Sequence, residues 1–293
     1  MIKKLLVAHG EGLGNVCQIL PTVRTIRETL GYEMDFWHIY GSFQIPKFFN
    51  YVDKWFVGRD ISKMDPSDYI GKVSTFWTLP FMNSPALMIL PLLGKSDKVR
   101  PDRSEVDTYM DIARDLGVKE ENILWYGKCG RRIMDRHYDI AIHDGYNRKS
   151  PDKSWRLKSY PYYDKVVELL PEFNICSLGG KDEVIKGTTD ETGLDLLSTL
   201  GIISNSKLFV GNDSGLYHCA NALGVRNIVI FTYTSTIKNY NSEFHKYTKI
   251  LQNYELDCLS CQNTSRFKTC TTRDCREIDP EIVADEIRRG FNG

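Results

Sequence analysis

The sequence predicts an α/β protein with two doubly wound, Rossmann-like domains that face a central cleft. Short apolar runs typical of buried strands alternate with stretches whose apolar residues recur every three or four positions. The length of 293 residues exceeds that of one ordinary domain and allows two cores. A polar, basic stretch at 128–136 separates two such alternating halves. We therefore expect an amino-terminal domain 1–136 and a carboxy-terminal domain 137–293.

In the first half, the run that ends at Gly10 suits a strand buried on both faces of a parallel sheet. The first helical pattern stops at Gly31, a common helix end, and Pro21 is expected to kink or restart that helix. Gly117 closes the second helical pattern. The predicted strands are 2–8, 34–40 and 55–57, and the predicted helices are 16–30 and 106–116.

The second half repeats this alternation without internal repeats or low-complexity segments. The predicted strands are 139–143, 174–178, 208–210 and 227–231, and the predicted helices are 162–170, 194–204 and 216–223.

Composition excludes several classes of protein. Lys plus Arg and Asp plus Glu both total 38, so there is no net charge to attract nucleic acid or anionic lipid. The longest apolar run, 86–93, is too short to span a membrane. Four of the eight cysteines are scattered among apolar neighbours, which favours a reducing compartment. We expect a cytoplasmic protein, with peripheral contact to the inner membrane face as the further option.

A strand, a turn and a helix in the second half form the first candidate site. Asp213 or Ser214 can cap the helix, and Gly215 lets a ligand approach the backbone. The amides and the dipole of such a helix start favour a phosphate. His218 lies four residues after Ser214, on the same helix face, and can donate to a phosphate oxygen. The pattern fits a tight turn with a buried histidine equally well.

Two loops before this segment carry further candidates. Gly180 and Glu183 follow a predicted strand, where glycine permits close approach and a carboxylate can accept hydrogen bonds from ribose hydroxyls. Lys153 precedes a predicted helix and can balance pyrophosphate charge, although a solvated lysine fits as well.

Taken in order, these segments resemble glycosyltransferase family 9, the ADP-heptose:lipopolysaccharide heptosyltransferases. Residues 211–218 are similar to the family's Asp-Ser/Thr-Gly-x-x-His signature. The tripeptide at 153–155 is similar to its Lys-x-Trp segment, and 179–183 to its Gly-rich segment. At the amino end, 12–21 resembles its Leu-Gly-Asp-x(5)-Pro pattern. The donor-binding residues that follow from this resemblance are Lys153, Gly180, Glu183, Asn212, Asp213, Ser214, Gly215 and His218.

The resemblance implies a GT-B fold and inverting transfer of a sugar, heptose or another, from an NDP-sugar of the ADP-sugar type. The donor would occupy the carboxy-terminal domain. The acceptor would be a hydroxyl of a glycan, a lipid-linked glycan or another compound, held mainly by the amino-terminal domain. No paired carboxylates at metal-binding spacing accompany these segments, so no catalytic metal is expected.

The sequence departs from the family at one position. Where the family has an aspartate, proposed as the general base, this chain has Asn15. Asparagine cannot take up a proton usefully at neutral pH, so Asn15 only positions the acceptor or another group is the base. Glu11, His9 and Asp35 are the candidates, next to an acceptor or phosphate loop that contains Gly12 and Gly14.

Four cysteines are concentrated in 258–275, with the spacing Cys258-x2-Cys261-x8-Cys270-x4-Cys275. The spacing favours a structural Zn or Fe site with four thiolates over two disulfides or free thiols. Four thiolates leave no open coordination position, so the role would be structural.

Two other functions stay open. Asn15 is compatible with a catalytically weakened protein that binds sugar nucleotides. Gly10, Gly12, Gly14 and Asp35 allow an NAD-dependent oxidoreductase, although their spacing differs from G-x-G-x-x-G.

Overall fold

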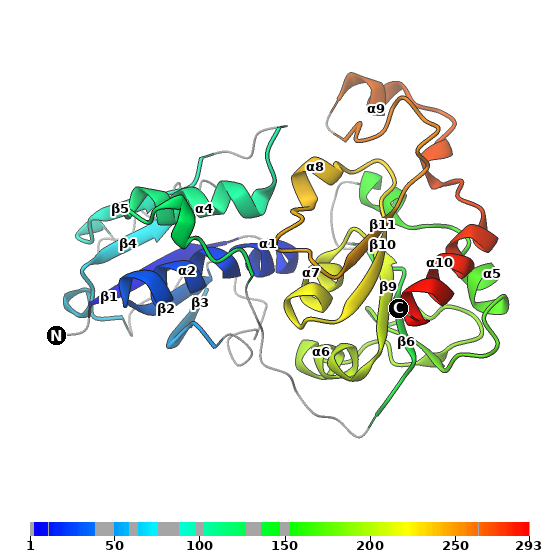
Figure 1. Cartoon of the computed structure of the whole chain (residues 1–293), viewed down its shortest axis with the longest axis horizontal. Helices are drawn as coiled ribbons and strands as arrows, with labels where there is room; N and C mark the ends of the chain where they lie inside the picture. Colours follow the sequence, from blue (N-terminus) through cyan, green and yellow to red (C-terminus); the bar gives the residue numbers. More distant parts are fainter. Residues whose placement is uncertain are drawn as a thin grey trace. The chain divides into compact units, whose positions relative to one another are not determined.

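The computed structural model describes residues 3–10, 12–38, 50–58, 64–75, 88–97, 102–126, 136–146, 153–262 and 264–292. By their internal contacts the residues divide into two units, shown in Figure 1. Unit 1 comprises Met1–Gly130 and Tyr240–Phe244, and unit 2 comprises Arg131–Asn239 and His245–Gly293. The boundary that we predicted at residue 136 adjoins 127–135, which lie outside the described residues, and it stays a prediction.

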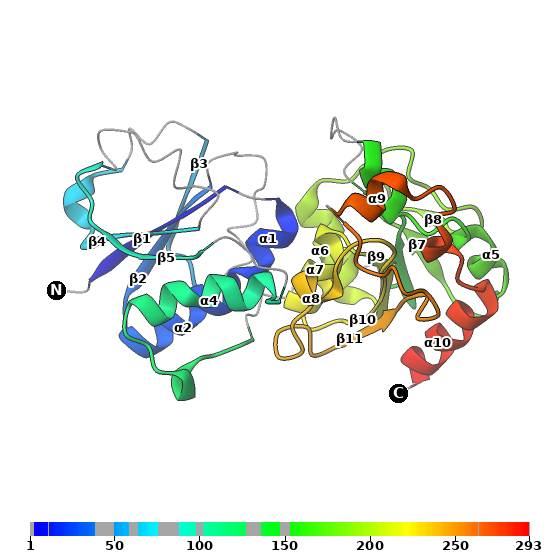
Figure 2. The same cartoon turned by 90° about the horizontal axis from the view of Figure 1, so that it is seen from above.

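Unit 1 contains a parallel five-stranded sheet in the order β3-β2-β1-β4-β5. Helices α2 and α4 pack against each other beside this sheet (Figure 2). The strand order reverses between β1 and β4, which makes their carboxyl ends a topological switch point. The elements are β1 (Lys4–His9), α1 (Leu13–Gln18), α2 (Leu20–Leu30), β2 (Glu33–His38), β3 (Lys54–Val57), η2 (Pro66–Asp68), β4 (Gly71–Ser74), β5 (Leu92–Lys95), α4 (Glu105–Asp115) and η4 (Glu120–Asn122).

The predicted helix 16–30 is two helices, as Pro21 led us to expect. Helix α1 ends before Ile19, and α2 restarts with Pro21 in its first turn, where a missing amide costs nothing. Gly31 ends α2 in the left-handed conformation, with φ of 68°. Strands β4 and β5 were not predicted, because β4 contains a single large apolar residue, Val73, and its lysine and glycine interrupt the pattern.

Unit 2 contains a parallel six-stranded sheet in the order β11-β10-β9-β6-β7-β8. If the six strands are numbered 1 to 6 in chain order, the sheet reads 3-2-1-4-5-6 from β8 to β11, which is the order of Rossmann folds. The switch point lies between β6 and β9. The strands are β6 (Ile140–His143), β7 (Ile175–Ser177), β8 (Thr189–Asp190), β9 (Leu208–Asn212), β10 (Arg226–Ile230) and β11 (Thr248–Leu251).

Helices cover both faces of this sheet, α6 and α7 on one and α5 and α10 on the other (Figure 1). The α5–α10 face encloses a core in which apolar side chains of β6, β9 and β10 contact both helices. The helices of the unit are η5 (Lys153–Lys158), α5 (Tyr163–Glu168), α6 (Leu196–Asn205), α7 (Gly215–Ala222), α8 (Thr236–Asn239), α9 (Ser265–Thr269), η6 (Asp274–Arg276) and α10 (Pro280–Asn292).

The strands and helices predicted for this half are present, with ends shifted by a residue or two. Strands β8 and β11 and helices α8, α9 and α10 were not predicted, and β8 offers no apolar pattern because both of its residues are polar. None of the helices within the described ranges is long and apolar enough to cross a membrane.

One buried histidine in each unit has a strongly lowered pKa. His9, at the carboxyl end of β1, has no exposed surface, and its Nδ1 lies 3.2 Å from Oγ1 of Thr75. The Nδ1 atom of His218, in α7, lies 2.9 Å from Nε2 of His245. Burial lowers the pKa of both histidines to about 3, with a smaller lowering by His38 and Lys158 respectively. Both imidazoles are therefore neutral in the folded protein at mildly acidic pH.

These two histidines should make the protein sensitive to acid. Between pH 6.5 and pH 3 the unfolded chain binds their protons and the folded chain does not, so stability falls as pH falls, by at most about 1.4 kcal/mol per pH unit for each histidine. His218→Gln should lose less stability between pH 7 and pH 5 than wild type, as measured by urea unfolding. The exposed His137→Gln is the control. An equal loss in His218→Gln and wild type would contradict this explanation.

Candidate functional site

The candidate site of unit 2 lies at its switch point. Strands β6 and β9 are neighbours, and Gly211 pairs with His143 at their carboxyl ends. A Cβ at position 211 would lie 3.0 Å from the His143 carbonyl oxygen, so glycine permits this close approach of the two backbones. The approach places the loop after β6 beside the turn that precedes α7, where open α/β sheets bind their ligands.

The start of α7 differs from our expectation in one respect. Neither Asp213 nor Ser214 caps this helix with its side chain, so the predicted capping is wrong. Ser214 instead points its Oγ toward His143 and lies 3.2 Å from Nδ1. The Asp213 carboxylate forms an ion pair with Lys158. The helix start therefore lacks a capping side chain, and Gly215 opens its first turn.

Asn212, the last residue of β9, is hydrogen-bonded to the loop after β6 and to the start of α5. Its Oδ1 accepts hydrogen bonds from the Tyr160 amide at 3.2 Å and the Tyr163 hydroxyl at 2.9 Å. Its Nδ2 donates to Oδ1 of Asp144 at 3.3 Å. Asn212 has no exposed surface. Asn212 therefore holds Asp144 and the entry to α5 in place, and its contact with the donor stays a prediction.

Lys158 is a residue that the sequence did not single out. Its Nζ lies 3.0 Å from Oδ2 of Asp213 and donates to the Asp213 carbonyl at 3.1 Å, and both side chains are buried. Asn239 donates to the same Oδ2 at 3.2 Å. Trp155 lies under the ammonium, 4.5 Å from Nζ to the ring centroid. The Lys158 ammonium thus neutralises the Asp213 carboxylate. Lys153, which we predicted from the same η5 segment, has its side chain outside the described residues.

The surroundings of His218 match the buried histidine that the sequence pattern also allowed. It is buried, with Nδ1 against His245 and Nε2 4.0 Å from Oδ1 of Asp213. Tyr217 stacks on His245 with 4.9 Å between ring centroids. His218 therefore supports the turn from beneath. Any hydrogen bond that it gives a phosphate comes from a neutral imidazole, because its pKa is about 3.

The Gly-rich loop joins the same site. Glu183 accepts a hydrogen bond from the Gly180 amide at 2.8 Å, and its Oε2 lies 3.6 Å from Nε2 of His143. Gly179 has a φ of 135°, and a Cβ there would lie 2.2 Å from Glu183. His143 thus stands between Glu183 and Ser214, and two motifs that are 31 positions apart in sequence are brought together by β6.

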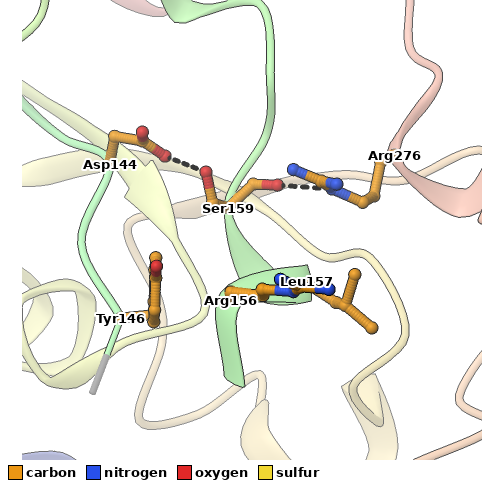
Figure 3. Close-up of a pocket in the computed structure, with 6 residues that line it drawn as sticks. All are labelled: Asp144, Tyr146, Arg156, Leu157, Ser159 and Arg276. Carbon is orange, nitrogen blue, oxygen red and sulfur yellow. Dashed lines mark hydrogen bonds between the residues drawn. The ribbon is translucent and has the colours of Figure 1, made fainter. Parts of the chain in front are cut away.

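A pocket of about 470 Å³ opens between the loop after β6 and the η5 segment (Figure 3). Ser159 lies between Asp144 and Arg276: its Oγ donates to Asp144 at 2.6 Å, and its carbonyl accepts from Arg276 Nε at 2.8 Å. Arg156 brings a second positive charge to the pocket. The lining residues are Asp144, Tyr146, Arg156, Leu157, Ser159 and Arg276.

Sequence reasoning missed both arginines. Arg156 lies in the basic stretch 153–158, a signal that was available, whereas Arg276 follows Cys275 and only the fold brings it here. The cysteine-bearing segment therefore supplies one side of the pocket.

The four predicted metal ligands lie in this segment as free thiols. Cys261 and Cys275 are buried against Tyr233, and Cys258 and Cys270 are half-buried. Burial, and then the neighbouring thiols, raise the pKa of Cys275 to about 11. Within the ranges that the structure describes, no group of three or more His, Cys, Asp or Glu side chains is arranged to hold a metal ion.

The predicted acceptor-side residues lie at the switch point of unit 1. Gly12 precedes α1 and Gly14 lies in its first turn. Asn15 donates to Glu105 and, at 3.1 Å, to the Tyr109 hydroxyl. Glu11 is outside the described residues.

Two of the base candidates are poorly suited to that role. His9 is fully buried, and with a pKa of about 3 it would hold a proton weakly. Asp35 is also fully buried, and it accepts a hydrogen bond from Tyr69 at 2.6 Å and lies 3.6 Å from Lys4.

Solved structures with similar folds include family 9 glycosyltransferases. At 14% identity each, the chain resembles a family 9 glycosyl transferase from Veillonella parvula DSM 2008 (TM-score 0.73, covering 99% of this chain and 97% of that one) and E. coli ADP-heptose LPS heptosyltransferase II (0.72, 99% and 99%). It also resembles the iron-containing dodecameric glycosyltransferase TibC from enterotoxigenic E. coli H10407 (14%, 0.66, 99% and 77%). These similarities establish the GT-B fold. No curated protein matches the sequence.

Residues 97–270 match the sequence profile of glycosyltransferase family 9 (heptosyltransferase). The match begins in unit 1, before α4, and includes every predicted donor-site residue and the first three cysteines of the cluster. Because it spans more than half of the chain, the protein belongs to glycosyltransferase family 9.

Proposed function

We propose that this glycosyltransferase moves a sugar, heptose or another, from an ADP-sugar to an acceptor hydroxyl with inversion at the anomeric carbon. The pocket of unit 2 is the observation that carries the proposal. Two arginines line it together with Asp144, which follows the carboxyl end of β6 and accepts a hydrogen bond from Asn212, three residues before α7. A diphosphate matches this combination of guanidinium groups and helix start.

Each part of a nucleotide sugar has a chemical partner at this site. Arg276, held through Nε by the Ser159 carbonyl, can direct its remaining donors at a phosphate. The Glu183 carboxylate suits ribose hydroxyls, as acidic residues of Rossmann folds do. Asp144, fixed by Ser159 and Asn212, can accept from hydroxyls of the transferred sugar.

The reaction needs charge stabilisation where the diphosphate leaves. The helix start at Gly215 and the two arginines would stabilise the developing negative charge without a catalytic metal. Lys158 contributes indirectly, since it neutralises Asp213 and so removes a negative charge from beneath the leaving group.

For the acceptor we propose a hydroxyl of a glycan, a lipid-linked glycan or a similar compound, because E. coli heptosyltransferase II, with the same fold, is an LPS enzyme by name. The cytoplasm is the proposed compartment, since Cys17, Cys176 and Cys219 are buried free thiols. No observation favours the oxidoreductase alternative.

Replacing Arg276 by alanine should weaken ADP binding roughly 10- to 100-fold, because a charge-assisted hydrogen bond contributes about 1.5–3 kcal/mol. Arg156→Ala should act similarly, and Arg289→Ala, an exposed arginine of α10, should bind ADP like wild type. Calorimetry with ADP and a panel of nucleotide sugars measures the affinities, and nucleotide release measures donor cleavage. If no nucleotide or nucleotide sugar binds the wild type, the proposed donor site is wrong.

We also propose that Cys258, Cys261, Cys270 and Cys275 hold a structural Zn or Fe ion. The support is their spacing, their position in one short segment, and a donor set of four thiols that suits either metal. Cys261 and Cys275 also belong to one apolar cluster. TibC, which has a similar fold, is an iron-containing protein by name. Because Arg276 follows Cys275 directly, a metal in this segment would stabilise one wall of the pocket.

Purified protein should therefore contain about one metal equivalent, and Cys258→Ser should contain less than half as much by elemental analysis. Chelation should lower the affinity for ADP along with the metal content. Cys219→Ser changes a thiol outside the segment and should retain the metal. A wild-type protein that is purified anaerobically and lacks metal would contradict the proposal.

A further inference from the structure

A buried carboxylate contacts the side chain of Asn15 in unit 1. Asn15 donates its Nδ2 hydrogens to Oε2 of Glu105 and to the hydroxyl of Tyr109. Glu105 and Tyr109 are one turn apart in α4, so they face α1 together. Asn15 and Glu105 are 90 positions apart in the sequence. The contact is therefore a product of the fold, and no local motif reveals it.

This contact lies where a doubly wound sheet binds its ligands. Helix α1 begins just after the carboxyl end of β1, and β1 borders the switch point between β1 and β4. Helix α4 follows β5, so its first residue, Glu105, starts from the same edge. Glu105 is only 4% exposed, whereas Asn15 is half-buried. The pair reaches solvent through Asn15.

The position of Glu105 at the start of α4 suits a carboxylate. Ser104 caps α4 and accepts from the Asp107 amide at 3.1 Å, which makes Glu105 the first residue of the helix. The amino end of a helix favours a carboxylate over a neutral side chain. Asn15 adds a second preference, because its Nδ2 group donates a hydrogen bond and an ionised carboxylate is the better acceptor.

We propose that Glu105 accepts the proton of the acceptor hydroxyl, and that Asn15 positions this carboxylate. The proposal rests on the transferase function proposed above. The acceptor oxygen forms a bond to the anomeric carbon of the donor, and the bond from that carbon to the diphosphate oxygen breaks. The electron pair leaves with the nucleoside diphosphate, and the proton moves to Glu105, from which it passes to water. The roles of base and positioning residue are thus divided between α4 and α1.

Glu105→Gln tests this role because it keeps the shape of the side chain and removes its basicity. ADP release from ADP-heptose, measured with a panel of hydroxyl acceptors and with water, should fall at least about 100-fold. ADP affinity, measured by calorimetry, should change less than about twofold, because the donor site lies in unit 2. Glu121→Gln, an exposed glutamate after α4, is the matched control and should be as active as wild type.

A swapped pair gives the sharper test. Asn15→Asp together with Glu105→Gln exchanges the carboxylate and the amide across the same contact. This double variant should be at least about tenfold more active than Glu105→Gln alone. Asn15→Asp alone places two carboxylates in contact and should lower the melting temperature by about 5 °C at neutral pH, and adding Glu105→Gln should restore it.

The outcomes separate the two proposals. If wild type cleaves ADP-heptose and Glu105→Gln cleaves it equally fast, Glu105 is not the base and the transferase function stands. If Asn15→Asp does not couple to Glu105→Gln in the melting temperature, the contact itself is refuted. If wild type neither binds ADP nor cleaves any nucleotide sugar, the proposed function fails and the proton-acceptor role of Glu105 fails with it.

Discussion

The buried ion pair between Lys158 and Asp213 is the interaction on which the site of unit 2 depends. It connects η5 to the turn before α7, and Asn239 of α8 hydrogen-bonds the same carboxylate. Removing one partner of a buried pair typically costs about 3–5 kcal/mol, because the other charge remains without compensation. Since Arg156 and Ser159 flank Lys158, the ion pair also fixes the part of the chain that lines the pocket. Asp213, a residue of the family signature, thus holds η5 and α8 against the turn before α7.

In both units a side-chain pair from distant elements secures the helix start at the switch point. In each, the chain leaves a central strand and begins a helix at the switch point, and a side-chain pair secures that helix start from a distant element. In unit 2 the pair is ionic, Lys158 with Asp213, and in unit 1 it is Asn15 with Glu105. Both pairs are largely buried, where an unpaired polar group is costly. The polar side chains of both sites therefore lie at sheet edges whose backbone is already held in place by packing.

Periodicity predicted the central strands and most covering helices because burial imposes a regular apolar pattern on them. It failed for β4 and β8, whose short segments contain at most one large apolar residue, and for β5 and β11, which are only four residues long. The donor motifs around Asp213 and Glu183 could be located by local pattern. Their surroundings could not, because Lys158, Arg276 and Glu105 reach their partners only through tertiary contacts. Local sequence suggested that Asp213 or Ser214 would cap α7, and long-range partners attracted both side chains instead.

The short segment Tyr240–Phe244 has a consequence for how the protein can be divided. By its contacts it belongs to unit 1, although the residues before and after it belong to unit 2. Asn241 within it donates to the Ser104 hydroxyl at 3.3 Å, next to Glu105, and Phe244 has no exposed surface. A gene fragment that stops near residue 130 would encode unit 1 without this piece. The two halves are thus not independent modules that recombination could exchange by a single crossover, and a hybrid enzyme would have to inherit 240–244 from the same parent as α4.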